Sequence, residues 1–248
     1  AGSRGDLLAR AMSPIAHRIR ELSVAEWGPE QAVDIIGLSD PFINVLSKVE
    51  KIAKYHEPVL ITGESGVGKE SIAQAIYLLS ELRGKPFASV NCPQYCEGNL
   101  TVSELFGHRK GSFTGAVEDR KGVFEAAHGG VIFLDEIADL HLDAQAMLLR
   151  ALASGEFRRI GDQIPRRADV RVVAATNRRL DELVVADQFR NDLYFRLRYF
   201  LLDVPPLRDR GDDWRMLLDY SLAKLRQQYG VAKRLSPDAL KMLASYDW

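Results

Sequence analysis

The 248-residue sequence has few cysteines and almost no net charge. Its two cysteines, Cys92 and Cys96, have no second pair or histidine in register with them, which excludes a zinc site of the usual spacing and predicts two reduced thiols. The 33 basic residues nearly balance the 34 acidic ones, giving a net charge of -1. No global field therefore draws the chain to nucleic acid or to an anionic membrane.

Long apolar runs are also missing. No run approaches the roughly 18 residues that a membrane-spanning helix requires, and the first residues lack the basic and then apolar pattern of a secretory signal. We therefore expect a cytoplasmic protein with no membrane partner. Hydrophobic residues make up 46% of the chain, which suffices for one substantial core and a small second domain.

Five short apolar runs alternate with helical patterns from residue 35 onward. The runs are β-branched or continuously apolar, as strands buried on both faces are. They cover residues 58–62, 87–91, 131–134, 170–176 and 199–204. Helices are predicted between them at 41–55, 69–82, 142–154 and 187–198. This alternation predicts an α/β fold with a five-stranded parallel sheet flanked by helices.

The two ends of the chain depart from this pattern. Residues 1–34 predict a linker with one short helix, capped by Ser13 and with Pro14 at its first position. The apolar residues there have heptad-like spacing, but Pro14 interrupts the seam and favours a helix packed on its own domain over a coiled coil. We expect an α/β domain over residues 35–206, followed by an incomplete helical domain at 207–248, and hence a fragment of a longer protein.

A glycine-rich loop directly follows the first predicted strand and opens a helix. In this setting backbone N–H groups cradle phosphate, the helix N-terminus adds positive potential, and Lys69 reaches the outer phosphates. Glu70 occupies the place where a serine or threonine hydroxyl binds magnesium in many such loops, so another acid must hold the metal. The residues predicted to bind nucleotide here are Gly63, Glu64, Ser65, Gly66, Val67, Gly68, Lys69 and Glu70.

Two acids, Asp135 and Glu136, follow the buried run at residues 131–134. They lie at the carboxyl edge of the predicted sheet, where ligands of such sheets bind. We expect Asp135 to hold the magnesium shell and Glu136 to orient and deprotonate the attacking water. Acids are also common where a strand end precedes a capped helix, but their pairing with the glycine loop favours nucleotide hydrolysis.

Six segments together carry a family resemblance: GESGVGKE, SELFGHRKGSFTGA, GGVIFLDEI, VRVVAATN, FRNDLYFRL and PPLRDRGDD. From about Ile35 to Trp248 the chain resembles the AAA+ domain of bacterial enhancer-binding proteins, the activators of sigma-54 RNA polymerase. The resemblance implies a P-loop AAA+ fold with a small helical lid, ATP and Mg²⁺ as cofactors, and a ring of six or seven copies. It also implies sigma-54 RNA polymerase holoenzyme as partner, and DNA binding only through a C-terminal domain absent from this chain.

The resemblance assigns roles to further residues near the nucleotide. Asn91 matches the position that hydrogen-bonds the catalytic Glu136 and holds it in check, and Asn177 matches the sensor of the γ-phosphate. A strand-terminating or turn-forming asparagine is the alternative at each position. Ile36 and Gly37 resemble the segment that lines the adenine pocket, although two apolar residues before a glycine also commonly begin a domain.

Two arginines, Arg190 and Arg196, match the arginine fingers that enter the neighbouring subunit's site. There a guanidinium neutralises the charge that develops on the transferred phosphoryl group. The alternative is a surface helix with an ion pair between Asp192 and Arg196. The finger assignment predicts that an isolated monomer hydrolyses ATP poorly.

Residues 111–116 read GSFTGA and match the family's sigma-54 contact loop, which has alanine at the second position. Glycines on both sides of the aromatic predict two hinges, since glycine adopts backbone angles that other residues avoid. We expect an exposed contact tip; the alternative is a tight turn whose aromatic packs into the core. The residues of this contact loop are Gly111, Ser112, Phe113, Thr114, Gly115 and Ala116. Residues 155–170 resemble a second inserted hairpin.

The sequence is compatible with three functions. The leading one is an ATPase that remodels a protein partner. The second is a nucleotide-gated binding module with little or no turnover, which Glu70 and the missing remainder of the lid make plausible. The third is another P-loop enzyme, a kinase or a GTPase; the GTPase is disfavoured because no Asn-Lys-x-Asp guanine signature occurs in the chain.

Overall fold

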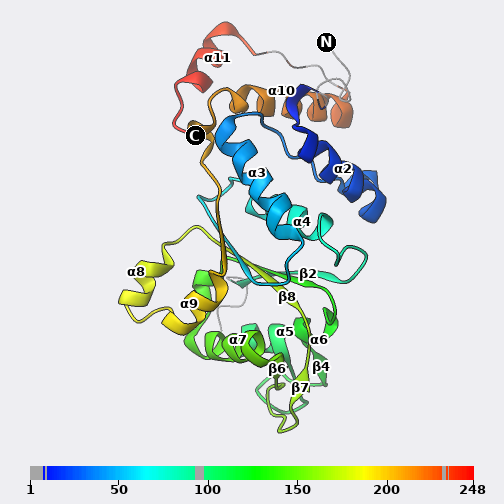
Figure 1. Ribbon diagram of the computed structural model, residues 1–248, viewed down its shortest axis with the longest axis vertical. Helices are drawn as coiled ribbons and strands as arrows, with labels where there is room; N and C mark the ends of the chain where they lie inside the picture. Colours follow the sequence, from blue (N-terminus) through cyan, green and yellow to red (C-terminus); the bar gives the residue numbers. More distant parts are fainter. Residues whose placement is uncertain (1–7, 9, 93–97, 231–232, 234) are drawn as a thin grey trace.

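A computed structural model of the protein describes residues 8, 10–92, 98–230, 233 and 235–248. A fully parallel sheet of five strands forms its centre, in the order β2-β5-β8-β1-β9 (Figure 1). The strands are β1 (Val59–Thr62), β2 (Phe87–Asn91), β5 (Val131–Asp135), β8 (Arg171–Thr176) and β9 (Phe200–Asp203). They coincide with the five predicted apolar runs, so the predicted α/β sheet is confirmed.

Helices cover both faces of the sheet (Figure 1). One face carries α2 (Pro14–Trp27), α3 (Asp40–Ala53) and α4 (Lys69–Leu78). The other carries α5 (Gly98–Phe106), α6 (Val123–Ala126), α7 (Leu142–Ser154), α8 (Leu180–Val185) and α9 (Asn191–Leu197). Alternate strand residues enter the two cores: Ile61 and Phe133 face the first, Leu60 and Leu134 the second. Burial on both sides explains the apolar interiors of the central strands β1, β5 and β8, whereas the edge strands β2 and β9 are partly exposed.

The N-terminal helix α2 packs on its own domain. The Ser13 hydroxyl caps it by accepting a hydrogen bond from Ala16 N at 3.3 Å, and Pro14 is its first residue. Ile19 is fully buried in the core that α2 shares with α3 and α4. The prediction of a packed helix rather than a free coiled-coil seam is confirmed.

The single helix predicted at residues 187–198 is wrong at its start. Only α9 corresponds to it, from Asn191 onward; α8 lies before the predicted range, and residues 186–190 connect the two helices. Asp187 adopts a left-handed backbone conformation, with φ of 55°. Gln188 N and Phe189 N both donate to Leu183 O, at 2.9 and 3.1 Å, and fold the chain back on α8. The apolar spacing continues across this turn, which is why periodicity alone does not locate it.

After β9 the described residues form only helices: η4 (Leu207–Arg210), α10 (Asp213–Tyr229) and α11 (Pro237–Ala244). These lie at the top of Figure 1. The carboxylate of Asp213 joins α10 to the start of α3, accepting from Leu38 N at 2.8 Å and Ser39 Oγ at 2.7 Å. Within the described ranges, no helix has the length and apolar character needed to cross a membrane.

Two short antiparallel hairpins extend from the opposite end of the molecule (Figure 1). The first pairs β3 (Gly107–His108) with β4 (Arg120–Lys121) and carries the contact loop. The second pairs β6 (Glu156–Phe157) with β7 (Arg166–Arg167), as predicted for the second inserted hairpin. They are joined at their bases, because Ile160 N donates to Gly107 O at 2.9 Å and Ile160 O accepts from Arg109 N at 3.0 Å.

A buried arginine, Arg171, closes the end of α3. Its side chain donates from Nη1 to Ala53 O at 2.6 Å and from Nη2 to Ile52 O at 2.9 Å, and the residue is only 1% exposed. Burial lowers the pKa of this guanidinium to about 10. The last carbonyls of a helix have no partner within the helix, so Arg171 supplies donors that the buried end of α3 lacks.

Replacing this arginine is expected to destabilise the fold. Arg171→Met should lower the free energy of unfolding by about 3 kcal/mol, because two buried carbonyls lose their donors. Urea denaturation at pH 7 measures the change. Arg167→Met, at an exposed arginine paired with Glu156, should alter the free energy by less than about 0.5 kcal/mol. Equal midpoints for the two variants would show that Arg171 does not stabilise the end of α3.

Candidate functional site

The glycine-rich loop joins β1 to α4 at the carboxyl edge of the sheet. Since β1 lies between β8 and β9, the loop emerges between neighbouring strands rather than at a margin. The side chain of Lys69 is 7% exposed. Its Nζ donates to Gly63 O and to Glu64 O, both at 3.1 Å. A buried ammonium thus lies against the inside of a loop whose form suits phosphate binding.

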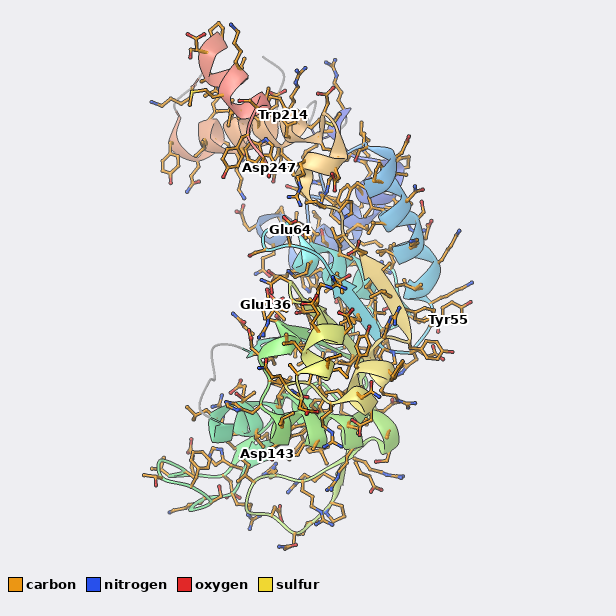
Figure 2. The ribbon with its side chains drawn as sticks, turned by 90° about the vertical axis from the view of Figure 1, so that its left-hand side faces the viewer. Tyr55, Glu64, Glu136, Asp143, Trp214 and Asp247 are labelled. Atoms are coloured by element: carbon orange, nitrogen blue, oxygen red, sulfur yellow. The ribbon has the colours of Figure 1, made fainter. Side chains whose placement is uncertain are left out.

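The acid pair lies beside this lysine. Glu136 Oε1 is 3.7 Å from Lys69 Nζ, and Glu136 Oε2 accepts from the backbone N of Asn177 at 3.2 Å. Asp135 Oδ1 accepts from Glu136 N at 3.0 Å. Glu136 has φ of 51° and ψ of 51°, a left-handed conformation that is uncommon for a residue with a side chain and that clusters at functional sites. The structure therefore brings four predicted residues together, Lys69, Asp135, Glu136 and Asn177. Figure 2 labels Glu136 among them.

The predicted contact between Asn91 and Glu136 is wrong. Asn91 is the parallel register partner of Asp135 at the end of β2, and its side chain is exposed. Within the described part of the chain it makes no hydrogen bond to Glu136. The left-handed turn at Glu136 directs that carboxylate toward Lys69 and Asn177 instead.

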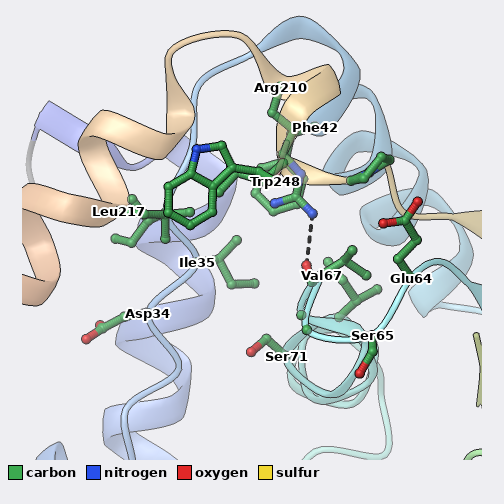
Figure 3. Close-up of a pocket in the computed structure, with 16 residues that line it drawn as sticks. Asp34, Ile35, Phe42, Glu64, Ser65, Val67, Ser71, Arg210, Leu217 and Trp248 are labelled. Carbon is green, nitrogen blue, oxygen red and sulfur yellow. Dashed lines mark hydrogen bonds between the residues drawn. The ribbon is translucent and has the colours of Figure 1, made fainter. Parts of the chain in front are cut away.

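A cavity of about 440 Å³ lies beside the loop (Figure 3). Its apolar lining includes Ile35, Ile36, Phe42, Leu217 and Trp248, and its polar lining includes Asp34, Arg210 and part of the loop. The loop residues that line it are Glu64, Ser65, Gly66, Val67 and Gly68. An apolar pocket that opens onto a phosphate-binding loop has the composition of a nucleotide site.

Six of the residues predicted to bind nucleotide are not part of this lining: Gly37, Gly63, Lys69, Glu70, Asp135 and Glu136. Gly37 is packed beside the cavity rather than in it, where a Cβ would come within 2.9 Å of the Phe42 ring. Glu70 is exposed in the first turn of α4. Ile36, by contrast, lines the cavity as predicted for the adenine pocket.

Two arginines of the PPLRDR segment, Arg208 and Arg210, reach the loop, although no role was predicted for either. Arg210 is 4% exposed, donates from Nη2 to Val67 O at 2.8 Å, and lies 4.0 Å from the centre of the Phe42 ring (Figure 3). Arg208 Nη1 donates to Glu64 Oε2 at 2.9 Å, and this guanidinium lowers the pKa of the Glu64 carboxyl. Their position could be predicted from the topology, because the segment directly follows β9, and β9 lies next to β1, which leads into the loop.

The two predicted finger arginines are both exposed but have different contacts. Arg190 precedes α9 and pairs with Asp192, at 2.8 Å from Nη2 to Oδ2. Arg196 donates from Nη2 to Leu152 O at 3.0 Å, on the adjacent helix α7. The alternative ion pair between Asp192 and Arg196 is therefore wrong, since Asp192 bonds Arg190 instead. Neither arginine lines the cavity of its own subunit.

The contact loop is held by its own backbone. Gly111 N donates to Ala116 O at 2.8 Å and closes the loop, and Gly111 and Gly115 have φ of 78° and 102°. Those positive values agree with the predicted need for glycine. The predicted exposed tip agrees with the exposed residues Thr114 and Gly115, but Phe113 itself is half-buried, with its ring edge-on to His108 at a centroid distance of 5.0 Å.

The serine of this loop packs against the second hairpin. A Cβ on Gly161 would lie 2.7 Å from Ser112 Cβ, so only glycine fits there. Ser112 Oγ is buried with no hydrogen-bond partner in the described part of the protein. An alanine at this position, as in the resembled family, would fill the same space without an unsatisfied hydroxyl.

One of the two cysteines, Cys92, lies near the acid pair. It is 1% exposed. Burial, and next the negative charges of Asp135 and Asp139, raise the pKa of its thiol to about 12. The neutral thiol is a poor nucleophile, in agreement with the predicted reduced form. Cys96 lies outside the described residues.

Comparison with known proteins gives consistent matches. The family model of the sigma-54 interaction domain matches residues 35–203. Nitrogen fixation protein VnfA of Azotobacter vinelandii is 46% identical over 216 residues, which cover 87% of this chain and 41% of that protein. Nitric oxide reductase transcription regulator NorR2 of Cupriavidus necator is 47% identical over 241 residues, covering 93% and 46%. The chain thus spans less than half the length of these relatives.

The solved structures of NtrX from Brucella abortus share the fold. Its complexes with ADP and with ATP each match this chain with a TM-score of 0.80 at 30% identity. The match covers 87% of this chain and 47% of NtrX.

Proposed function

Because the chain belongs to the family of sigma-54 interaction domains, we propose that it is the ATP-hydrolysing, ring-forming part of a sigma-54-dependent transcriptional activator. One observation carries the proposal: the loop lysine, Lys69, lies 3.7 Å from the carboxylate of Glu136, beside an apolar cavity at the carboxyl edge of the sheet. This arrangement joins a phosphate cradle, a general base and a pocket for a base ring.

ATP is the proposed occupant of the cavity. Its base would lie among Ile35, Ile36 and Leu217, and its phosphates along the glycine-rich loop. The NtrX complexes with ADP and ATP support this choice, because that protein shares the fold at 30% identity. Arg210 contributes by fixing the loop carbonyl at Val67.

The carboxylate of Asp135 is the proposed magnesium ligand. It ends β5 half-buried beside the acid of Glu136. No group of three or more metal-binding side chains occurs among the residues that the structure describes. One carboxylate together with phosphate oxygens is the usual way in which proteins hold Mg²⁺, so the residues present fit this ion. Bound there, Mg²⁺ would neutralise charge on the phosphate oxygens.

Hydrolysis then depends on Lys69, Glu136 and Asn177. A γ-phosphate draws the Lys69 ammonium away from Glu136, because phosphate carries more negative charge than one carboxylate. The freed carboxylate orients water and accepts its proton. The exposed side chain of Asn177 lies next to Glu136, since its backbone N bonds that carboxylate, and we assign it to sensing the γ-phosphate.

A concentration series tests the proposal. Arg190 and Arg196 lie outside the cavity of their own subunit, so the proposed fingers serve a neighbouring copy. ATP hydrolysis per subunit should therefore rise with protein concentration as rings assemble. ATP binding without hydrolysis at every concentration would instead support the nucleotide-gated binding module.

Phe113→Ala tests the proposed output loop. The variant should keep ATP hydrolysis within about two-fold, since the loop lies at the end of the molecule opposite to α10 (Figure 1), and should lose the complex with sigma-54. A large apolar anchor of this kind commonly contributes more than about 2 kcal/mol to an interface. A pull-down of sigma-54 with an ATP transition-state mimic measures the loss.

Val117→Ala is the matched control, because Val117 is 77% exposed and follows the same loop. It should retain the sigma-54 complex. If Phe113→Ala unfolds the domain or abolishes hydrolysis, the ring contact with His108 is structural and the assignment of Phe113 to the partner fails.

A further inference from the structure

A buried amide in α7, that of Gln145, has no part in the proposed chemistry. The residue is fully buried. Its Nε2 donates to Leu140 O at 2.8 Å and to Gln188 O at 3.1 Å, and its Oε1 accepts from Arg190 N at 2.8 Å. Both amide protons and one oxygen lone pair are therefore engaged, all by backbone groups.

These three bonds join two segments that are distant in sequence. Leu140 closes the short 3₁₀ turn η3 (Ile137–Asp139) that directly follows Glu136. Gln188 and Arg190 belong to the irregular connection between α8 and α9. One side chain thus bonds both the segment after the acid and the residue that precedes α9.

Other backbone bonds also restrain this connection, since Arg190 O accepts from Tyr194 N at 3.0 Å in the first turn of α9. Gln188 N and Phe189 N bond back to Leu183, and the Phe189 side chain is buried. The backbone N of Arg190 itself bonds Gln145. The Arg190 side chain is exposed. The position of its Cα is therefore set by these backbone bonds rather than by packing of the guanidinium.

We propose that Gln145 is a positioning residue that fixes the backbone of Arg190 so that its side chain can enter the neighbouring subunit's nucleotide site. The proposal rests on the proposed function, in which Arg190 acts in trans. A misplacement of about 1 Å in a catalytic group lowers turnover by roughly 100-fold. Through Leu140, the same amide links the finger that a subunit donates to the acid segment of its own site.

The first experiment measures steady-state ATP hydrolysis by Gln145→Met, which removes the amide at similar volume. We expect turnover at saturating ATP to fall by about 100-fold, with the KM for ATP changed by less than about two-fold. Gln74→Met is the matched control at a half-buried glutamine of α4, and should retain the turnover of the unmutated protein. Normal turnover by Gln145→Met would overturn the proposal.

The second experiment mixes variants within one ring and separates positioning from a general effect on folding. Glu136→Gln lacks its own base but donates a normal finger, whereas Arg190→Ala keeps its base and donates none. If Gln145 positions Arg190, mixing Gln145→Met with Glu136→Gln restores hydrolysis and mixing it with Arg190→Ala does not. The reverse pattern would show that Gln145 serves the acid of its own subunit. No restored hydrolysis in either mixture would show that Gln145 serves only the fold. Either outcome overturns the proposal.

The mixture of Arg190→Ala with Glu136→Gln is the reference. Hydrolysis restored in this mixture shows that fingers act in trans independently of Gln145. Hydrolysis that stays lost would overturn the proposed function itself. Thermal melting monitors the fold of each variant. If Gln145→Met does not fold, Gln145→Asn replaces it in the same mixtures, since it keeps a buried amide whose shorter side chain does not reach Leu140 O, Gln188 O and Arg190 N together.

Discussion

Glu136→Gln is expected to bind ATP normally and to hydrolyse it about 10²- to 10⁴-fold more slowly. The amide has the shape of the carboxylate but accepts no proton from water. Its oxygen still accepts from Asn177 N, so the left-handed turn at Glu136 should persist. Loss of the negative charge 3.7 Å from Lys69 Nζ removes a competitor for the ammonium, which should leave ATP affinity unchanged or slightly higher.

Turnover by coupled assay and binding of a fluorescent ATP analogue measure the two quantities separately. Glu182→Gln is the matched control, because this exposed glutamate of α8 pairs only with Arg179 in the described structure and lies outside the cavity. It should retain normal turnover. Unmutated turnover by Glu136→Gln would show that another group deprotonates the water.

The sheet and the phosphate loop were predictable because their signals are local. Strands β5 and β8 are continuously apolar between their ends, at residues 131–134 and 172–175, since both of their faces are buried, and that pattern is visible in one segment at a time. The loop before Lys69 combines glycine spacing with a strand on one side and a helix on the other. Each of these features depends on fewer than about 12 consecutive residues.

The misjudged contacts depend on residues far apart in the chain. Nothing in the local sequence of Glu136 predicts its left-handed conformation or the bond that its carboxylate accepts from Asn177 N. The ring of Phe113 packs on His108 because a short hairpin folds the loop back. Gln145 bonds the backbone of Arg190 across 45 positions, and a glutamine within an amphipathic helix gives no sign of such a partner.

Arg190→Ala is expected to lower turnover by about 10³-fold or more while leaving ATP binding by the single subunit unchanged. A finger that neutralises charge on the transferred phosphoryl group contributes about 10³ to 10⁵ in rate. Arg190 does not line the cavity of its own subunit and pairs with Asp192 instead. The side chain therefore contributes nothing to nucleotide affinity until a neighbour is present.

Hydrolysis at a concentration that supports rings, together with ATP binding at a concentration that does not, measures both parts of this prediction. Arg179→Ala is the control, since Arg179 is an exposed arginine with an equivalent local pair to Asp181, and it should keep full turnover. Asp192→Asn adds a second check. The Asp192 carboxylate competes with phosphate for Arg190, so its neutralisation should preserve or raise turnover. Loss of hydrolysis in Asp192→Asn, with full hydrolysis in Arg190→Ala, would reverse the assignment and make the carboxylate the functional partner of this pair.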